Sequence, residues 1–387
     1  MYNSQGINDI LFLMSYGGVA MYALITGLYL LFRRGNAIDP SVSSSKILRQ
    51  WAAAFMFSVV ASHLWWPLVG LASDGDDKLI RIIIVEVLDY ITVFPLIIVV
   101  MIYMLQDRKR EIWPIAVGLL PVVMIAVIGL VTRYELTEIA MAAYTLLACI
   151  AFIIYMVRAV RQYGRWLRDN YADMEHKEVW QSLLLLVAII LIYLLYAFDS
   201  GSLLLEYLTQ INSVVSISFI VWRVETLQKL DCGCQREDWT EKVVSQGEER
   251  LATGNSEACE EKENVSASTS TPSNIGSLLE KYCKEKKIYL LNDLSLSQLA
   301  LHIGTNRTYL SAYFAQQGIT YNTYINRLRI EYFIKIYREQ VSSLKRPLTA
   351  QQLAELSGYK SYSTFSAAFK KIMGENVTTW MKSENGS

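Results

Sequence analysis

The sequence predicts an all-α protein in two parts. A seven-helix transmembrane bundle is followed by a cytoplasmic domain in which a linker helix joins two helix-turn-helix units. Three observations predict this architecture: long apolar runs fill the chain up to about residue 223, the charge balance changes after that point, and a ten-residue pattern occurs twice within residues 277–387.

Composition and charge divide the chain into three ranges. The chain is 53% hydrophobic with a mean hydropathy of +0.26, which is too apolar for an ordinary cytosolic enzyme. Residues 1–223, the membrane domain, carry 16 basic and 17 acidic side chains. The connector, 224–276, carries 5 and 11, and the final domain, 277–387, carries 15 and 8. A basic final domain favours a partner of negative charge.

Seven apolar segments occupy the membrane domain, each near the roughly 20 residues that a helix needs to cross a bilayer. They lie at about 10–32, 51–72, 83–105, 112–132, 136–157, 180–198 and 203–222. One such run could be a buried helix of a soluble protein, but seven in succession predict a multi-pass membrane domain in contact with lipid.

The loops between these segments predict the orientation, because short loops rich in Lys and Arg stay in the cytoplasm. Alternate loops hold most of the cations: Arg33, Arg34, Lys46, Arg49, Arg108, Lys109, Arg110, Arg158, Arg161, Arg165, Arg168 and Lys177. The other loops hold Lys78, Arg81 and Arg133. We therefore expect the N-terminus outside and the final domain in the cytoplasm. The first nine residues lack Lys and Arg, which favours a retained span over a cleaved signal peptide.

Four ionisable residues lie within the expected spans: His63, Glu86, Asp89 and Glu206. Because charge at such depth is costly, these residues usually face the bundle interior or an aqueous cavity. They form a candidate site for an unknown small-molecule or peptide signal. The alternative for Glu86 is an interfacial position with Arg81 as its neutralising partner. Four prolines could kink the spans and open a cavity: Pro67, Pro95, Pro114 and Pro121.

Motifs for catalysis are absent from the sequence. The chain has no HExxH, no GxSxG, no phosphate-binding glycine loop and only three histidines. Cys232 and Cys234 form a close pair, which leaves a redox or metal sensor open, but two thiols without a second pair make a poor zinc site. We expect no enzyme activity, no metal and no cofactor.

The final domain contains an internal repeat. Ser295, Gln298, Leu299, Ala300 and Gly304 recur 54 residues later as Thr349, Gln352, Leu353, Ala354 and Gly358. In each copy the hydroxyl residue and the Gln predict a capping box, the Ala permits a close helix crossing, and the Gly permits a turn. After each turn come apolar residues spaced to face inward, Leu310 and Phe314 in one copy and Phe365 and Phe369 in the other.

Between the copies, residues 321–338 predict one amphipathic helix without Pro or Gly. Such a linker can hold two recognition helices apart so that both enter the major groove of DNA, about 34 Å from each other. The repeat and the linker together predict two helix-turn-helix units in one domain.

Residues 280–382 resemble the AraC/XylS-type DNA-binding domain. The resemblance rests on LSLSQLALHIGTNRTYLSAYF, INRLRIEYF and LTAQQLAELSGYKSYSTFSAAFKKIMG. It implies a transcription factor whose remaining segment senses a signal, and a seven-span sensor fused to this domain resembles the membrane-bound regulators of bacteria. The implied location is the bacterial inner membrane.

The chain departs from the family where the family places cations in the recognition helices: here stand Ala312, Ala315 and Ala367. The closing segment also differs, with Asn376, Val377, Trp380 and Met381. The outward positions that remain to face bases are Arg307, Thr308, Ser311, Tyr362, Ser363 and Ser366. Expected phosphate contacts are Asn306, Arg327, Arg329, Lys360, Ser361, Lys370 and Lys371. Short hydroxyls discriminate bases less well than Arg does, so we expect modest affinity per monomer.

These observations predict a membrane-bound, sequence-specific transcriptional regulator that binds double-stranded DNA and is a homodimer when active. Its membrane domain would sense the signal and control the helix-turn-helix domain. The alternative is a transporter or receptor whose helix-turn-helix-like tail is a protein-interaction module. The missing cations keep this alternative open.

Overall fold

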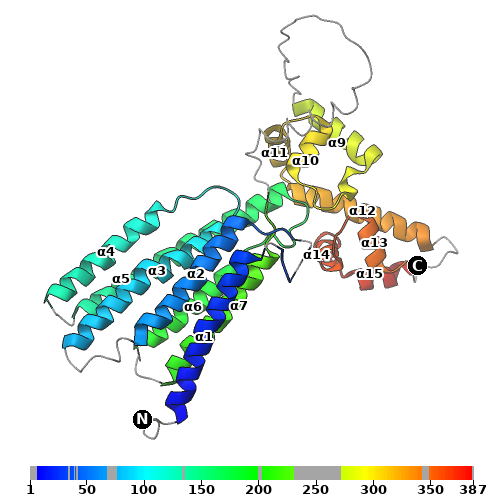
Figure 1. Ribbon diagram of the computed structural model, residues 1–387. Coiled ribbons are helices and arrows are strands. Elements are labelled where there is room, and N and C mark those ends of the chain that lie inside the picture. Colours follow the sequence, from blue (N-terminus) through cyan, green and yellow to red (C-terminus); the bar gives the residue numbers. More distant parts are fainter. Residues whose placement is uncertain are drawn as a thin grey trace, which may run out of the picture. The chain divides into compact units, whose positions relative to one another are not determined.

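The computed structural model describes residues 7–33, 35–38, 40, 42–67, 76–132, 136–198, 203–230, 272–341 and 348–385. The chain folds into two compact units, and each is described by itself (Figure 1). The first unit is Met1–Tyr163 with His176–Leu230, and the second is Gly164–Glu175 with Asp231–Ser387. Most of the expected connector lies outside the described residues, as do Arg34, Arg133, Cys232 and Cys234.

The regular secondary structure described in the first unit is helical, as the apolar runs predict. Its helices are α1 (Ile7–Phe32), α2 (Lys46–Trp65), α3 (Asp76–Tyr103), α4 (Trp113–Thr132), α5 (Leu136–Asn170), α6 (Trp180–Phe198) and α7 (Leu203–Thr226). Helices α1 to α4 pack as neighbours in chain order, and α7 packs against α1, α2 and α6 (Figure 1). The result is an all-helical bundle.

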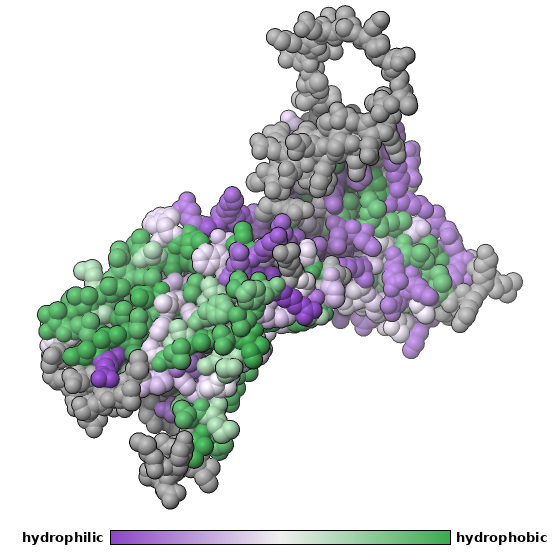
Figure 2. Space-filling model, in the orientation of Figure 1, coloured by the Kyte–Doolittle hydropathy of each residue, from purple (hydrophilic) through white to green (hydrophobic). Residues whose placement is uncertain are grey.

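Five described helical segments are long and apolar enough to cross a membrane. They are Ile10–Phe32, Ile80–Tyr103, Trp113–Thr132, Ile139–Asn170 and Leu204–Thr226. Figure 2 shows apolar side chains spread over the outside of this unit, whereas soluble monomeric proteins rarely expose large contiguous apolar patches. The described apolar stretch of α6 is shorter, and α2 carries Lys46 and Arg49, so the number of seven spans stays a prediction.

Helix α5 is longer than its apolar pattern. That pattern ends near residue 157, but the helix continues through Asn170 and includes Arg158, Arg161, Arg165 and Arg168, which were expected in a loop. Arg, Gln and Leu are good helix formers, and Ala159, Tyr163 and Leu167 of this continuation are buried, so helix propensity and apolar packing both extend past residue 157. The last part of α5, from Gly164 to Asn170, belongs to the second unit.

The first unit also encloses a buried ion pair between Arg49 of α2 and Glu225 of α7. Arg49 Nη1 lies 2.8 Å from Glu225 Oε1, and the two side chains are 6% and 0% exposed. Glu225 Oε2 also accepts hydrogen bonds from the backbone N–H groups of Ala37 and Ile38. Arg49 is therefore a buried helix residue, and the prediction that it lies in a loop was wrong.

Replacing Glu225 by Gln is expected to destabilise the first unit by about 3–5 kcal/mol, because the Arg49 guanidinium would stay buried without its counter-charge. The measurement is the thermal unfolding midpoint of the purified protein in detergent. Glu111→Gln is the matched control, since Glu111 is exposed and accepts a hydrogen bond from the exposed Trp113. Equal shifts for the two variants would contradict the burial argument.

The second unit contains two helix-turn-helix units. Its helices are α9 (Pro272–Lys286), the short 3₁₀ helix η3 (Ile288–Leu290), α10 (Leu296–Ile303), α11 (Arg307–Gln316), α12 (Tyr321–Val341), α13 (Ala350–Leu356), α14 (Tyr362–Met373) and α15 (Val377–Asn385). Helices α10 and α11 form the first pair, α13 and α14 form the second, and α12 joins them (Figure 1). The all-α prediction is confirmed for the described residues.

Both predicted capping boxes are present. The Ser295 side chain accepts from the backbone N–H of Gln298, whose side chain accepts from the backbone N–H of Ser295. Thr349 and Gln352 repeat this arrangement at the start of α13. These reciprocal bonds satisfy N–H groups that helix geometry leaves without partners, which fixes where α10 and α13 begin.

Helix α12 carries a hydrophobic core on each half. Tyr321 and Ile325 belong to the core shared with α9, α10 and α11, whereas Ile330, Phe333 and Tyr337 belong to the core shared with α13, α14 and α15. The predicted linker helix therefore also supplies apolar surface to both helix-turn-helix units. Separating either helix-turn-helix unit from α12 would expose its core to water.

Candidate nucleic-acid interface

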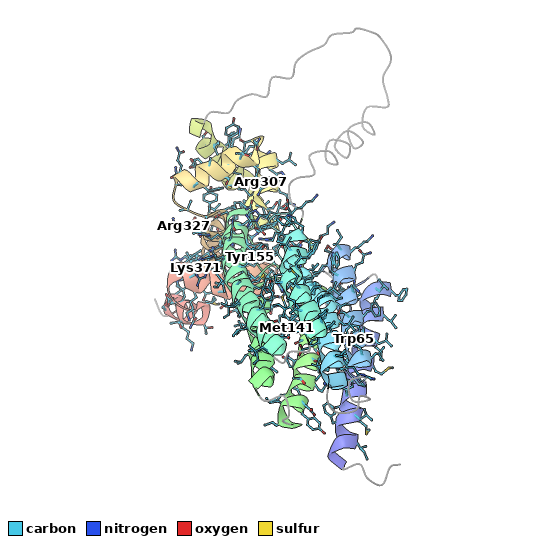
Figure 3. The ribbon with its side chains drawn as sticks, turned by 90° about the vertical axis from the view of Figure 1, so that its left-hand side faces the viewer. Trp65, Met141, Tyr155, Arg307, Arg327 and Lys371 are labelled. Carbon is cyan, nitrogen blue, oxygen red and sulfur yellow. The ribbon has the colours of Figure 1, made fainter. Side chains whose placement is uncertain are left out.

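The first recognition helix, α11, presents its polar residues away from the core. Leu310 and Phe314 are buried, as their spacing predicts, while Thr308 and Ser311 are exposed. Arg307, labelled in Figure 3, stands at the first position of the helix and is half-buried. Thr308 and Ser311 therefore lie on the side of α11 that can approach a base edge.

The second recognition helix, α14, is built in the same way. Phe365 and Phe369 are 0% exposed and fix the inward face. Tyr362 and Ser363 are exposed in the first turn, and Ser366 is half-buried. All three predicted base-facing positions therefore lie on the outer part of the helix, near its N-terminus.

The predicted phosphate contacts fall into two groups by their place on the helices. Asn306 is the N-cap of α11 and Ser361 is the N-cap of α14, so both stand where backbone N–H groups point outward. Lys360 is exposed next to Ser361. Lys370 and Lys371 lie in the last turn of α14, at the opposite end of the helix from Ser361. Each residue between the two ends adds about 1.5 Å along the helix axis.

The two linker-helix arginines differ sharply. Arg327, labelled in Figure 3, is exposed and forms a 3.4 Å ion pair with Glu331. Arg329 is 0% exposed. Its guanidinium donates to the carbonyl oxygens of Tyr289 and Leu291 at 2.7 and 2.8 Å and to Asp173 Oδ1 at 2.9 Å. The phosphate contact predicted for Arg329 would therefore need a rearrangement.

Three residues of the second unit that contact this interface were missed from the sequence. Asn170, Asp173 and Glu175 follow the apolar part of α5, and their side chains bond to Arg307, to Arg329 and to the start of α14. The polar run after the fifth apolar segment was the only sequence signal. A single sequence does not show which residues such a run meets.

The altered closing segment is part of the core. Val377 and Trp380 of α15 are 1% and 5% exposed, and Trp380 packs against Phe333, Tyr337 and Phe369. The departures at these two positions therefore lie in the core of the second unit. Ala312, Ala315 and Ala367 are exposed, so the outer faces of α11 and α14 do lack side-chain donors there.

Burial also raises the pKa of four groups in the second unit. Burial raises the pKa of the Cys283 thiol, and burial with the Cys283 contact raises the pKa of the Tyr324 hydroxyl. Burial likewise raises the pKa of Tyr321 and Tyr359. These four groups therefore stay neutral near pH 7.

In the first unit, two of the four candidate signal residues have identified side-chain partners. Asp89 accepts from the indole N–H groups of Trp65 and Trp66 at 3.0 and 2.7 Å (Trp65 is labelled in Figure 3). His63 Nε2 lies 3.2 Å from Gln210 Oε1. Because both groups are hydrogen-bonded and part-buried, they can remain polar within an apolar bundle.

Glu86 and Glu206 are also partly buried. A separate apolar cavity of about 420 Å³ lies between α3, α4, α5 and α6, and its wall includes Tyr90, Pro95 and Tyr155. Of the prolines expected to open a cavity, Pro95 and Pro114 line this one. None of the four candidate signal residues is in its wall.

Across the described residues, no group of three or more His, Cys, Asp or Glu side chains is placed to hold a metal ion. Residues 299–383 match the family model of a helix-turn-helix domain, of the AraC type, which confirms the resemblance. No curated protein and no solved structure matches the chain significantly.

Proposed function

From the matched helix-turn-helix domain, a domain of DNA-binding regulators, we propose that this protein is a membrane-bound regulator of transcription. Its second unit binds double-stranded DNA through α11 and α14. The observation that carries the proposal is the repeated placement of polar residues on the first turns of α11 and α14. Helices α11 and α14 each share a core with α12. A fixed separation of this kind is needed for two recognition helices to enter the major groove on successive turns of DNA.

The first unit is proposed to sense the signal and to lie in the inner membrane of a bacterium, with the N-terminus outside. Its apolar helices support insertion. The part-buried pairs at Asp89 and His63 and the apolar cavity are two separate places where a small molecule or peptide could shift the bundle. Because the outer faces carry mostly hydroxyl groups, a homodimer is proposed as the active form.

The DNA face can be tested with a negative charge placed on it. Ser311→Glu is expected to weaken binding of a random-sequence duplex by at least about tenfold, since a carboxylate would face the phosphates. Gln316→Glu is the matched control. It adds the same charge to α11 but lies about 140° around the helix from Ser311 and at the far end.

Binding is measured by fluorescence anisotropy with the full-length protein in nanodiscs over a range of salt concentrations. Each phosphate contact makes the slope of log affinity against log salt concentration more negative by about 0.9. Binding without salt dependence, or weakened equally by both substitutions, would instead favour a protein-interaction tail on a transporter or receptor.

A further inference from the structure

Residues 170–175, here called the strap, lie on the two recognition helices of the second unit. They comprise the last residue of α5 and the five residues after it, and they belong to the second unit although about 100 residues of chain separate them from α9. Their contacts with α11 and α14 occupy side chains that the proposed function assigns to DNA.

On the first recognition helix the strap holds Arg307. Its Nε and Nη2 atoms donate to Asn170 Oδ1 at 3.1 and 2.6 Å, and Asn170 is itself buried. Arg307 is the one cation among the six expected base-facing residues. The planar fork that would read a guanine is therefore already in use.

On the second recognition helix the strap places a carboxylate. Glu175 Oε2 accepts from the hydroxyl groups of Ser361 and Thr364, the latter at 2.9 Å. Ser361 is the N-cap of α14 and Thr364 lies in its first turn. The N-terminus of a helix favours an anion, so Glu175 stands where a DNA phosphate would bind.

The middle of the strap is anchored to elements other than the two recognition helices. The Ala172 backbone N–H donates to Leu294 O at 3.2 Å, and its carbonyl accepts from the Asn322 and Asn326 amides of α12. Asp173, 3% exposed, forms the 2.9 Å ion pair with Arg329. These buried contacts hold the strap in a defined position on the second unit.

We propose that the strap is an autoinhibitory element that competes with DNA for α11 and α14. The inference rests on the proposed function. While the strap is docked, Arg307, Ser361 and Thr364 are bonded to Asn170 and Glu175, and DNA must displace these bonds to bind. Because α5 is one helix from Leu136 to Asn170, a shift of its apolar part along or around its axis withdraws the strap and frees both recognition helices.

The test compares strap variants of the full-length protein in nanodiscs, with a fluorescent random-sequence duplex as the probe. The double variant Asn170→Ala with Glu175→Gln removes the acceptor that holds Arg307 and the negative charge at the start of α14, and it leaves the Asp173 anchor. It is expected to bind the duplex between about 5-fold and 150-fold more tightly than the unaltered protein, the usual range for coupling between two sites.

Asp169→Asn is the matched control. It removes one negative charge next to the strap, where Arg165 and Arg168 are the charged neighbours, and it is expected to leave the affinity unchanged. Protection of Cys283 from a maleimide checks that the second unit of each variant is folded, since this thiol is 2% exposed.

Three outcomes separate the two proposals. Tighter binding by the folded double variant alone supports the strap. Equal, salt-dependent binding by all folded proteins, or weaker binding by the double variant, overturns the strap and leaves the proposed function in place. If even the folded double variant does not bind, the proposed function fails and the strap fails with it.

Discussion

Replacing Arg329 by Ala is expected to lower the free energy of unfolding of the second unit by about 3–5 kcal/mol. The substitution would leave the Asp173 carboxylate, 4% exposed, buried without its counter-charge. It would also remove the donors to the Tyr289 and Leu291 carbonyl oxygens. Each lost donor adds the cost of an unsatisfied buried acceptor.

The thiol of Cys283 provides the measurement for this prediction. Cys283 lies in the core next to η3, and burial raises its pKa, so the folded unit protects it from maleimides. In a chain whose other four cysteines are replaced by Ser, the labelling rate reports opening of this core. A loss of about 3 kcal/mol should accelerate labelling by more than about 100-fold.

Arg327→Ala is the control for Arg329→Ala, because Arg327 lies on the same helix but is 73% exposed in its side chain. Its ion pair with Glu331 is solvated, and removing such a pair usually changes stability by less than about 1 kcal/mol. If Arg327→Ala and Arg329→Ala accelerate labelling of Cys283 equally, the buried ion pair does not hold the unit together.

Gly358→Ala is expected to destabilise the second unit by about 2–5 kcal/mol, and Gly304→Ala by only about 1–2 kcal/mol. The two glycines are equivalent in the sequence repeat and both have positive φ, +87° and +75°. A Cβ on Gly358 would lie 2.8 Å from both the Cα and the carbonyl oxygen of Leu290, whereas one on Gly304 would meet no atom within 4 Å. Backbone atoms cannot move aside as the end of a side chain can.

The labelling rate of Cys283 also measures this pair of variants. Both substitutions place an alanine in the left-handed region, so that cost cancels in their difference and the remaining effect is the collision with Leu290. Similar labelling rates for Gly304→Ala and Gly358→Ala would show that the backbone at Leu290 yields at little cost.

The local features of the second unit could be predicted from the sequence. Capping boxes, inward residues such as Leu310 and Phe365, and the long linker helix all depend on residues within a few positions of each other. Side-chain spacing and hydrogen-bonding capacity determine them directly. The helical first unit was likewise predicted from a local feature, the length of its apolar runs.

The long-range contacts could not be predicted in this way. The sequence predicts Arg329 to be an outward-facing cation on an amphipathic helix. Its burial is explained by its contact with Asp173, which is 156 residues away in the chain. The pairs of Arg307 with Asn170 and of Arg49 with Glu225 are separated by 137 and 176 residues. Periodicity shows which face a residue occupies, but it does not show what that face meets.

The two cores on α12 have a consequence for how sequences of this kind can diverge. One residue inserted in the middle of α12 would turn the second helix-turn-helix unit by about 100° relative to the first and move it by about 1.5 Å. Such a change would either remove one core from the face of α12 on which it packs, or turn α14 away from the groove that α11 is proposed to enter. The number of residues in α12 therefore cannot change without disturbing one of the two cores. Insertions and deletions during evolution must fall outside Tyr321–Val341, even though the repeat offset of 54 residues includes this helix.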